Sequence, residues 1–287
     1  MMRYVVITPV RDEERYIEST IESILHQTIL PAEWVIVDDG SSDRTGAIAD
    51  RYAAQYPWIH VVHRNNRGFR KSGGGVVEAF YDGYHSLEQK EWDFIVKLDG
   101  DLTFAPDYFA RCFEYFDRDP KLGIGGGEIN HDIEGELKVE QNPRFHVRGA
   151  TKIYRRACWE GIGGLWPASG WDTIDEVKAN MLGWSTYAFP DLPLLHHRQT
   201  GMEEGLMRDR VKHGVACYVS GYHPLFVAAS CARRLSQKPR VVGSLGILYG
   251  FLKAHFTRPP RLKDRTYVAY IRGQQLRRLF GMETIWR

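Results

Sequence analysis

The sequence predicts an α/β fold in which helices flank a mostly parallel sheet, followed by a C-terminal helical tail that is both basic and apolar. In the first hundred residues, short apolar runs alternate with helical segments, a pattern typical of a parallel sheet covered on both faces. These runs end on polar or acidic residues, and ligands of open α/β sheets bind beyond the carboxyl ends of the strands. We therefore expect a binding site at one edge of the sheet.

Four strands and three helices are predicted for the first part of the chain. The strands are apolar runs over residues 4–9, 34–37, 59–63 and 94–98. The helices cover residues 14–27, the segment from a Ser42 or Asp43 cap to residue 56, and a segment opened by the glycines at 73–75. Because parallel strands run in the same direction, the residues that end them meet at one edge.

The second part is predicted to contain a helix over residues 177–182 and a strand over residues 187–195. The glycines at 125–127 either bring the backbone close to a ligand or mark a bulged strand. They lack the third glycine of a dinucleotide loop, and Arg70 stands where a P-loop needs a glycine before Lys71. The sequence therefore supports neither a dehydrogenase nor a P-loop kinase.

The strand over residues 94–98 ends on Asp99-Gly100-Asp101. Mg²⁺ and Mn²⁺ prefer oxygen ligands and commonly take one or two carboxylates together with the phosphates of a substrate. Two carboxylates at a strand end can therefore hold a divalent ion against a diphosphate. Asp-Gly is also ordinary turn chemistry after a strand. The pair Asp38 and Asp39 ends a second strand at the same edge, which favours the ion-binding interpretation.

Several segments, in their order and spacing, resemble the family 2 glycosyltransferases, whose GT-A fold is a Rossmann-like nucleotide-sugar fold. The matching segments are residues 6–14 (VITPVRDEE), 35–45 (VIVDDGSSDRT), 68–79 and 94–101 (FIVKLDGD), the last followed by Pro106-Asp107. The resemblance covers at least residues 3–200. The chain departs from the family at Arg11-Asp12, where members often carry Tyr-Asn, and it lacks the Q-x-x-R-W segment of processive members. The resemblance implies an inverting, non-processive transferase that uses a nucleotide sugar.

The resemblance also implies a metal site next to a diphosphate site. Asp101 is the expected direct ligand of Mg²⁺ or Mn²⁺, and Asp99 is expected to bind the metal, a coordinated water or the ribose. The family often places a histidine after the strand that is predicted over residues 187–195. Either His196 or His197 would then complete the metal site, and Arg198 would neutralise phosphate charge.

Nucleotide contacts are implied for the loops that follow the first three strands. Asp39 is expected to accept a hydrogen bond from the base, and the Thr8-Pro9 segment is expected to receive the nucleoside. Arg70 and Lys71 would contact the base or the phosphates, and solvated loop charge is the alternative for both. The remaining residues expected at the nucleotide site are Asp12, Glu14, Asp38, Asp99 and Gly100.

Direct displacement at an anomeric carbon needs a carboxylate that takes the proton of the acceptor hydroxyl. In the resembled family this base belongs to a Glu-Asp motif just before the helix that is predicted here over residues 177–182. The motif corresponds to Trp171-Asp172, with Trp171 in place of the Glu, so Asp172 is the expected base. Asp175 is the second candidate, and helix capping is the structural alternative for both. Trp166 and Trp171 are expected either in a wall that stacks on the sugar or in the core.

The charge of the chain is unevenly distributed, although the net charge is only +2. Residues 201–287 contain 16 Lys plus Arg and 5 Asp plus Glu, whereas residues 1–200 contain 22 and 31. The basic part surrounds the apolar run 241–256, which is shorter than the roughly 20 residues that cross a bilayer. We expect this run either to lie on an anionic membrane surface or to pack as a core or dimer helix. Nucleic acid is not expected, because the basic residues do not interleave with stacking aromatics.

These features predict a catalytic domain over residues 1–200, with a nucleotide-binding half over 1–105 and an acceptor half over 106–200, and a helical extension over 201–287. The expected reaction is transfer from a UDP- or GDP-linked sugar to a hydroxyl of a lipid-linked or surface-polysaccharide glycan. Transfer onto polyprenyl phosphate and a non-catalytic nucleotide-sugar-binding protein are the alternatives. The four cysteines have no C-x-x-C spacing, which favours the reducing cytoplasm. Together with the basic residues around the apolar run, this predicts a protein that is peripheral on the inner face of the membrane.

Overall fold

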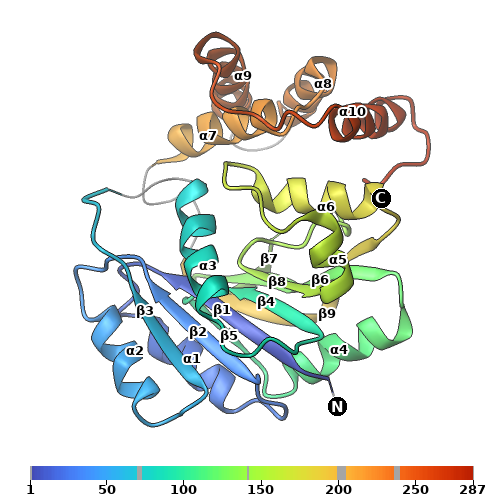
Figure 1. Ribbon diagram of the computed structural model, residues 1–287. Helices are drawn as coiled ribbons and strands as arrows, with labels where there is room; N and C mark the ends of the chain where they lie inside the picture. The colour runs from blue at the N-terminus through green and yellow to red at the C-terminus, as the bar shows by residue number, and fades with distance from the viewer. Residues whose placement is uncertain (1, 70–72, 141, 199–204, 236–239, 287) are drawn as a thin grey trace.

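The computed structural model describes residues 2–69, 73–140, 142–198, 205–235 and 240–286 of the 287-residue chain. Within these ranges one sheet carries helices on both faces, and a further group of helices lies beside it (Figure 1). The strands are β1 Tyr4–Val10, β2 Glu33–Asp38, β3 Ile59–His63, β4 Phe94–Leu98, β5 Leu102–Phe104, β6 Leu122–Ile133, β7 Glu136–Val139, β8 Thr151–Arg155 and β9 Ser185–His196. The helices are α1 Ile17–Leu25, α2 Thr45–Ala53, α3 Gly74–Ser86, α4 Tyr108–Arg118, α5 Arg156–Ile162, α6 Trp171–Met181, α7 Leu206–Val219, α8 Pro224–Arg234, α9 Arg240–Thr257 and α10 Arg265–Leu279.

The strand order of the sheet is β3-β2-β1-β4-β8-β6-β9-β5, with β7 paired to β6. The pairs among β1, β2, β3 and β4 are parallel, as the alternation of strands and helices predicts. Beyond β4 the sheet becomes mixed, because β8 pairs antiparallel with both β4 and β6, and β5 pairs antiparallel with β9. The α/β fold class is confirmed, and its parallel part lies within residues 1–105, for which a nucleotide-binding half is predicted.

Alternate residues of the central strands serve the two faces of the sheet, as the period of a strand requires. Val6 and Val96 pack with the side chains of α1, α2 and α4, whereas Val5 and Ile95 pack with those of α3, α5 and α6. Both faces are therefore buried, and the open part of the sheet is the edge where the parallel strands end.

The strands of the first half lie where the sequence predicts them, and β3 and β4 match to the residue. Helix α6 differs from the prediction, because it begins at Trp171 and not at residue 177. The polar residues of its first turns, Asp175 and Glu176, are buried and bonded to Lys152 of β8, so they belong to the helix and not to a preceding loop.

The glycines at 125–127 lie inside β6 and are explained by packing. The β6/β9 pairing shifts register between Gly127 and Glu128, so the bulged-strand alternative applies here. A Cβ at Gly127 would lie 2.2 Å from the carbonyl oxygen of Leu192, so only glycine fits that contact.

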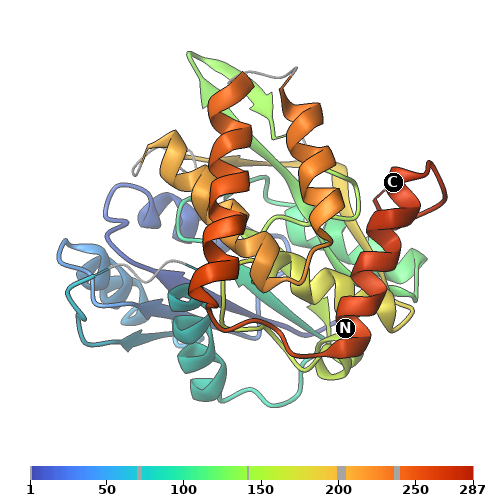
Figure 2. The ribbon, with the colours of Figure 1, turned by 90° about the horizontal axis from the view of Figure 1, so that it is seen from above.

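Helices α7 to α10 form a group beside α6, which the view from above shows in front of the sheet (Figure 2). Helices α7 and α9 pack closely through glycine, since a Cβ at Gly214 would lie 2.1 Å from the carbonyl oxygen of Ile247. Helix α10 packs on α6, where Tyr267 and Ile271 contact the cluster around Ile174. Among the described helices, none combines the length and the apolarity needed to span a membrane.

Candidate active site

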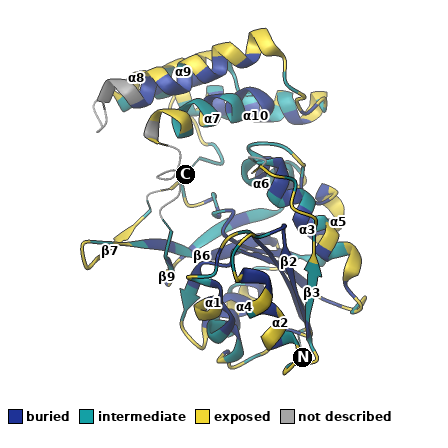
Figure 3. Cartoon of the chain, turned by 90° about the vertical axis from the view of Figure 1, so that its left-hand side faces the viewer, coloured by how far each residue is buried: buried dark blue, intermediate teal, exposed yellow. Residues whose placement is uncertain are grey.

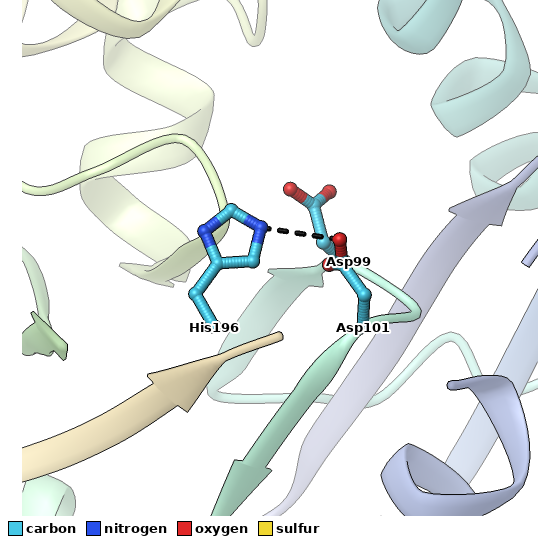
Figure 4. A group of neighbouring side chains, drawn as sticks. All are labelled: Asp99, Asp101 and His196. Carbon is cyan, nitrogen blue, oxygen red and sulfur yellow. Dashed lines mark hydrogen bonds and ion pairs between the residues drawn. The ribbon is translucent and has the colours of Figure 1, made fainter. Parts of the chain in front are cut away.

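Three potential metal ligands converge at the carboxyl edge of the sheet. Asp99 follows β4, Asp101 precedes β5, and His196 ends β9. The pairing of Leu102 with His196 in β5/β9 brings the neighbouring Asp101 next to the imidazole. One ligand atom from each of the three side chains lies within 4.8 Å of the others, and the side chains face one another (Figure 4). The group combines residues almost a hundred positions apart.

The donor set suits a divalent cation. Two carboxylates and an imidazole provide oxygen and nitrogen ligands of the kind that Mg²⁺ and Mn²⁺ accept. The Nε2 atom of His196 lies 3.2 Å from Oδ2 of Asp101. Its Nδ1 atom is buried and has no hydrogen-bond partner among the described residues. The residues present therefore fit a metal ion, which would be held by Asp101 and His196 with Asp99 beside them.

The electrostatics of this group keep Asp101 ionised. Burial raises the pKa of the Asp101 carboxyl, but the hydrogen bond and charge of His196, together with Arg198, lower it below its ordinary value. Burial lowers the pKa of His196, but the carboxylate of Asp101 outweighs burial and raises it. Burial also raises the pKa of Asp99, against the opposing charge of Lys97. The two carboxylates are therefore stable here only beside cations.

His197 lies apart from Asp99, Asp101 and His196, which we call the metal group. Its Nε2 atom is 3.1 Å from the hydroxyl of Thr103, and its ring stacks on Tyr16 with 5.5 Å between the centroids. Of the two histidines expected as alternatives, the structure brings His196 to the carboxylates. Arg198 forms an ion pair with Glu13 and has its Nε atom 3.8 Å from Asp101, so it adds a positive charge beside the carboxylates.

Asp39 is buried at the end of β2 and is held by two arginines. Its oxygens pair with Arg64, at 2.5 Å, and with Arg67. Asp38 has a local role, because it accepts a hydrogen bond from the amide of Ser41 and lies 3.2 Å from Nδ1 of His63. Sequence reasoning missed Arg64, although an arginine directly after a strand of the same sheet could have indicated it.

The residues expected at the nucleotide site in and after β1 have contacts within the protein. Thr8 and Pro9 are buried within the strand, and the Thr8 hydroxyl accepts a hydrogen bond from the indole of Trp34 at 2.9 Å. Asp12 accepts a hydrogen bond from the amide of Ser42, and Glu14 pairs with Arg44 in the loop before α2. These side chains join the β1 loop to the β2 loop.

Two further expectations concern the same edge. Gly100 lies in the turn between the two aspartates, and a Cβ there would be 2.4 Å from Cγ1 of Val10, so the turn packs against β1 only with glycine. Arg70 and Lys71 lie outside the described residues.

The two candidate bases have different surroundings. The side chain of Asp172 is 24% exposed, and its Oδ2 atom lies 3.8 Å from Nη1 of Arg148. Burial raises the pKa of Asp172, but His146, Lys152 and Arg148 together lower it below its ordinary value. Asp172 is therefore ionised and can be reached by an acceptor.

Asp175 is enclosed. It is buried, accepts from Lys152 at 2.9 Å and from the hydroxyl of Tyr154 at 2.5 Å, and burial raises its pKa to about 6 despite the charge of Lys152. This arrangement favours Asp172 as the base and a structural role for Asp175.

The two tryptophans were expected either in a sugar-stacking wall or in the core, and the structure places Trp171 in the core and leaves Trp166 half-buried. Trp166 packs in the cluster between α6 and α10, and Trp171 is 7% exposed. Sequence reasoning missed Arg148 and two buried lysines, Lys97 and Lys152. A lysine inside an apolar strand such as β4 or β8 was the available signal, since an unpaired charge is not buried.

Comparison with known proteins gives a consistent result. The family described as Glycosyl transferase family 2 matches residues 5–168. EpsH of Bacillus subtilis (strain 168), which is named as a glycosyltransferase, is 32% identical over 217 residues, covering 67% of this chain and 60% of EpsH. The undecaprenyl-phosphate mannosyltransferase of Micrococcus luteus is 29% identical over 155 residues, covering 54% of this chain and 59% of that protein. The chain thus matches less than two thirds of the length of these relatives.

Among solved structures, the mannosyltransferase PcManGT from Pyrobaculum calidifontis, in complex with GDP-Man and Mn²⁺, has a TM-score of 0.57 at 17% identity. The match covers 98% of this chain and 88% of that one. Staphylococcus aureus TarS in complex with UDP has a TM-score of 0.53 at 17% identity, over 89% of this chain and 72% of that one. These likenesses confirm the GT-A fold.

The first prediction concerns the metal. MnCl₂ should raise the melting temperature of the protein, because the ion would compensate the buried carboxylates, and Asp101→Asn should abolish this shift. The measurement is a thermal-shift titration with MnCl₂. Asp191→Asn, which removes an exposed carboxylate of β9, is the matched control and should keep the shift. An equal shift in Asp101→Asn and in the unmodified protein would remove Asp101 from the metal site.

The second prediction concerns pH. A metal ligand must be the neutral imidazole, so protons compete with the ion at His196. Because the pKa of His196 is raised above 6.5, Mn²⁺ binding should weaken as the pH falls from 8.5 to 6. Isothermal titration calorimetry at several pH values measures this. His197→Asn should keep the pH dependence and His196→Asn should flatten it, whereas the same profile in all three proteins would contradict the assignment.

Proposed function

Because the chain belongs to glycosyl transferase family 2, we propose that it transfers a sugar from a nucleoside diphosphate to a hydroxyl acceptor, with inversion and with a divalent metal. The observation that carries this proposal is the proximity of the metal group to Asp172. Gly149 links them: its carbonyl accepts from Lys97, the partner of Asp99, and a Cβ on it would lie 3.3 Å from Cβ of Asp172. Departure of the diphosphate and deprotonation of the acceptor hydroxyl can therefore take place at one sugar.

The proposed roles follow from the contacts. A bound Mg²⁺ or Mn²⁺ would neutralise charge on the diphosphate leaving group. Asp101 and His196 hold that ion, and Arg198 adds a positive charge beside them. Asp172 accepts the proton of the attacking hydroxyl, and Arg148 keeps it ionised and oriented. Asp39 is proposed to bind the base of the nucleotide, UDP or GDP in type.

A second candidate function is transfer onto polyprenyl phosphate. The relatives include the undecaprenyl-phosphate mannosyltransferase and the polyprenol monophosphomannose synthase of Mycolicibacterium smegmatis, which is 29% identical over 124 residues. A phosphate acceptor is already ionised and needs no strong base. Arg148, whose side chain is 22% exposed beside Asp172, would then bind the acceptor phosphate.

We propose that α9 rests on an anionic membrane and so brings the enzyme to a lipid-linked acceptor, whether the acceptor is a glycan or a polyprenyl phosphate. One face of α9 packs inward, where Ile247, Phe251 and Ala254 are buried. The opposite face is exposed and points away from the sheet (Figure 3). This outer face of α9 consists of four apolar residues at helical spacing: Leu245, Tyr249, Leu252 and Phe256.

Basic residues border this outer face. Lys253, Arg258 and Arg261 are exposed, and each basic residue near an anionic leaflet contributes about 1 kcal/mol. The apolar run 241–256 was expected either to pack or to contact a membrane. We propose both for α9, because one of its faces packs and the other is available to lipid.

We propose residues 1–200 as the catalytic domain, residues 201–287 as the extension, and the cytoplasmic face of the membrane as the location.

The third prediction tests the base. Asp172→Asn should keep donor binding but lower nucleoside diphosphate release from UDP-glucose or GDP-mannose by roughly 100-fold or more, the scale of a positioned acid or base. Release is measured with MnCl₂, and binding by calorimetry. Asp175→Asn is the matched control: it should reduce thermal stability and lower release far less than Asp172→Asn does. Loss of release in Asp175→Asn alone would exchange the two roles, and full release onto polyprenyl phosphate in Asp172→Asn would favour the second candidate.

The fourth prediction tests the membrane surface. The full chain should bind vesicles that contain phosphatidylglycerol, less at high salt, and the double variant Leu252→Ser/Phe256→Ser should bind them at least several-fold less. Flotation of the vesicles measures this. Leu137→Ser/Val139→Ser, a change of two exposed apolar residues of β7, is the matched control and should bind as the unmodified chain does. Equal binding of both variants, or no binding of the full chain, would contradict the proposal.

A further inference from the structure

Two lysines lie opposite each other inside the sheet. Lys97 of β4 and Lys152 of β8 are direct partners in the antiparallel pairing, so their side chains project from the same face. Lys97 is 2% exposed and Lys152 is fully buried. Like charges directly opposite on a sheet are destabilising, and a buried ammonium needs compensation. Their retention side by side therefore calls for specific partners.

The partners of the two lysines belong to different halves of the candidate active site. The Nζ atom of Lys97 bonds to the carboxylate of Asp99 and, at 2.6 Å, to the carbonyl oxygen of Gly149. Lys97 thus fixes the metal side.

Lys152 fixes the base side. Its Nζ atom lies 2.9 Å from carboxylate oxygens of Asp175 and Glu176 and donates to the carbonyl oxygen of Asp172. One ammonium therefore contacts the first two turns of α6, including the backbone of the proposed base.

The indole of Trp171 joins the two lysines. Each Nζ atom lies 5.5 Å from its ring centroid, within the range of a cation–π contact. A Cβ at Gly149 would lie 2.9 Å from the ring and 3.3 Å from Cβ of Asp172. The segment just before β8 is therefore in direct contact with the start of α6. We call Lys97, Trp171 and Lys152 the lysine–indole stack.

We propose that the lysine–indole stack is a positioning unit that sets Asp172 at a fixed separation from Asp99 and the metal group. The proposal rests on the proposed function, in that it assumes Asp172 to be the base. Binding of the donor requires the metal side alone, whereas transfer requires both sides in register. Loss of the indole should therefore lower kcat and leave the KM for the donor unchanged.

The experiment compares Trp171→Leu, which removes the aromatic face, with Trp171→Phe, which keeps one. Trp92→Leu is the matched control, because Trp92 is equally buried and lies 5.0 Å from the guanidinium of Arg156, but precedes β4 at the strand end far from the site. Trp171→Leu should lower kcat for diphosphate release from UDP-glucose or GDP-mannose roughly 10- to 100-fold at unchanged KM. Trp171→Phe should recover most of this loss, and Trp92→Leu should lower stability without the kcat loss.

A second measurement does not depend on activity. Hydrogen exchange of the amides of residues 171–176 should be at least tenfold faster in Trp171→Leu than in the unmodified protein, and unchanged in Trp92→Leu. If Trp171→Leu fails to fold, Gly149→Ala replaces it, because its added methyl displaces the indole while every charged group remains.

The outcomes separate the two proposals. Unchanged exchange over residues 171–176, or an equal loss in kcat for Trp92→Leu, would overturn the positioning role. A rise in the donor KM with unchanged kcat would overturn it too. If the unmodified protein releases no diphosphate, the proposed function fails, and the exchange measurement alone decides whether the stack fixes α6.

Discussion

Carboxylates can be buried next to one another only where cations compensate them, and this constraint shapes the edge of the sheet at which the parallel strands end. Several acidic side chains that are buried or half-buried there have a cationic partner close by among the described residues. The pairs are Asp39 with Arg64 and Arg67, Asp99 with Lys97, Asp101 with His196, and Asp175 and Glu176 with Lys152. The carboxylates of this edge are thus paired with basic residues from the strands and loops around it.

This compensation depends on the register of the sheet. Lys97 and Lys152 reach the same face because β8 pairs antiparallel with β4 at this alignment. A slip of one residue would send the lysine of β8 to the other face, among the apolar side chains of α1 and α4. The switch from parallel to antiparallel pairing at β8 is therefore part of the site, since it brings the support of α6 beside the metal carboxylates.

The first half of the fold could be predicted from the sequence because its signals are local. Apolar runs that end on polar or charged residues placed β1 to β4 closely, and the end of β4 located Asp99 and Asp101. The surroundings of Asp172 could not be predicted in the same way. They depend on a lysine in β8 and an arginine in the loop before it, and only long-range strand pairing brings these to α6. For α9, a periodic apolar run cannot tell which face packs, since this depends on glycine contacts with α7.

The helical extension is connected to the base as well as to the proposed membrane face. Helix α10 packs on α6 through Tyr267 and Ile271, while α9 packs on α7 and α8 and exposes its outer face on the far side. Since packed interiors deform little, the lysine–indole stack and the α10 contact hold α6 on different faces. The proposed base therefore lies on a helix that the sheet holds on one side and the helical extension on the other.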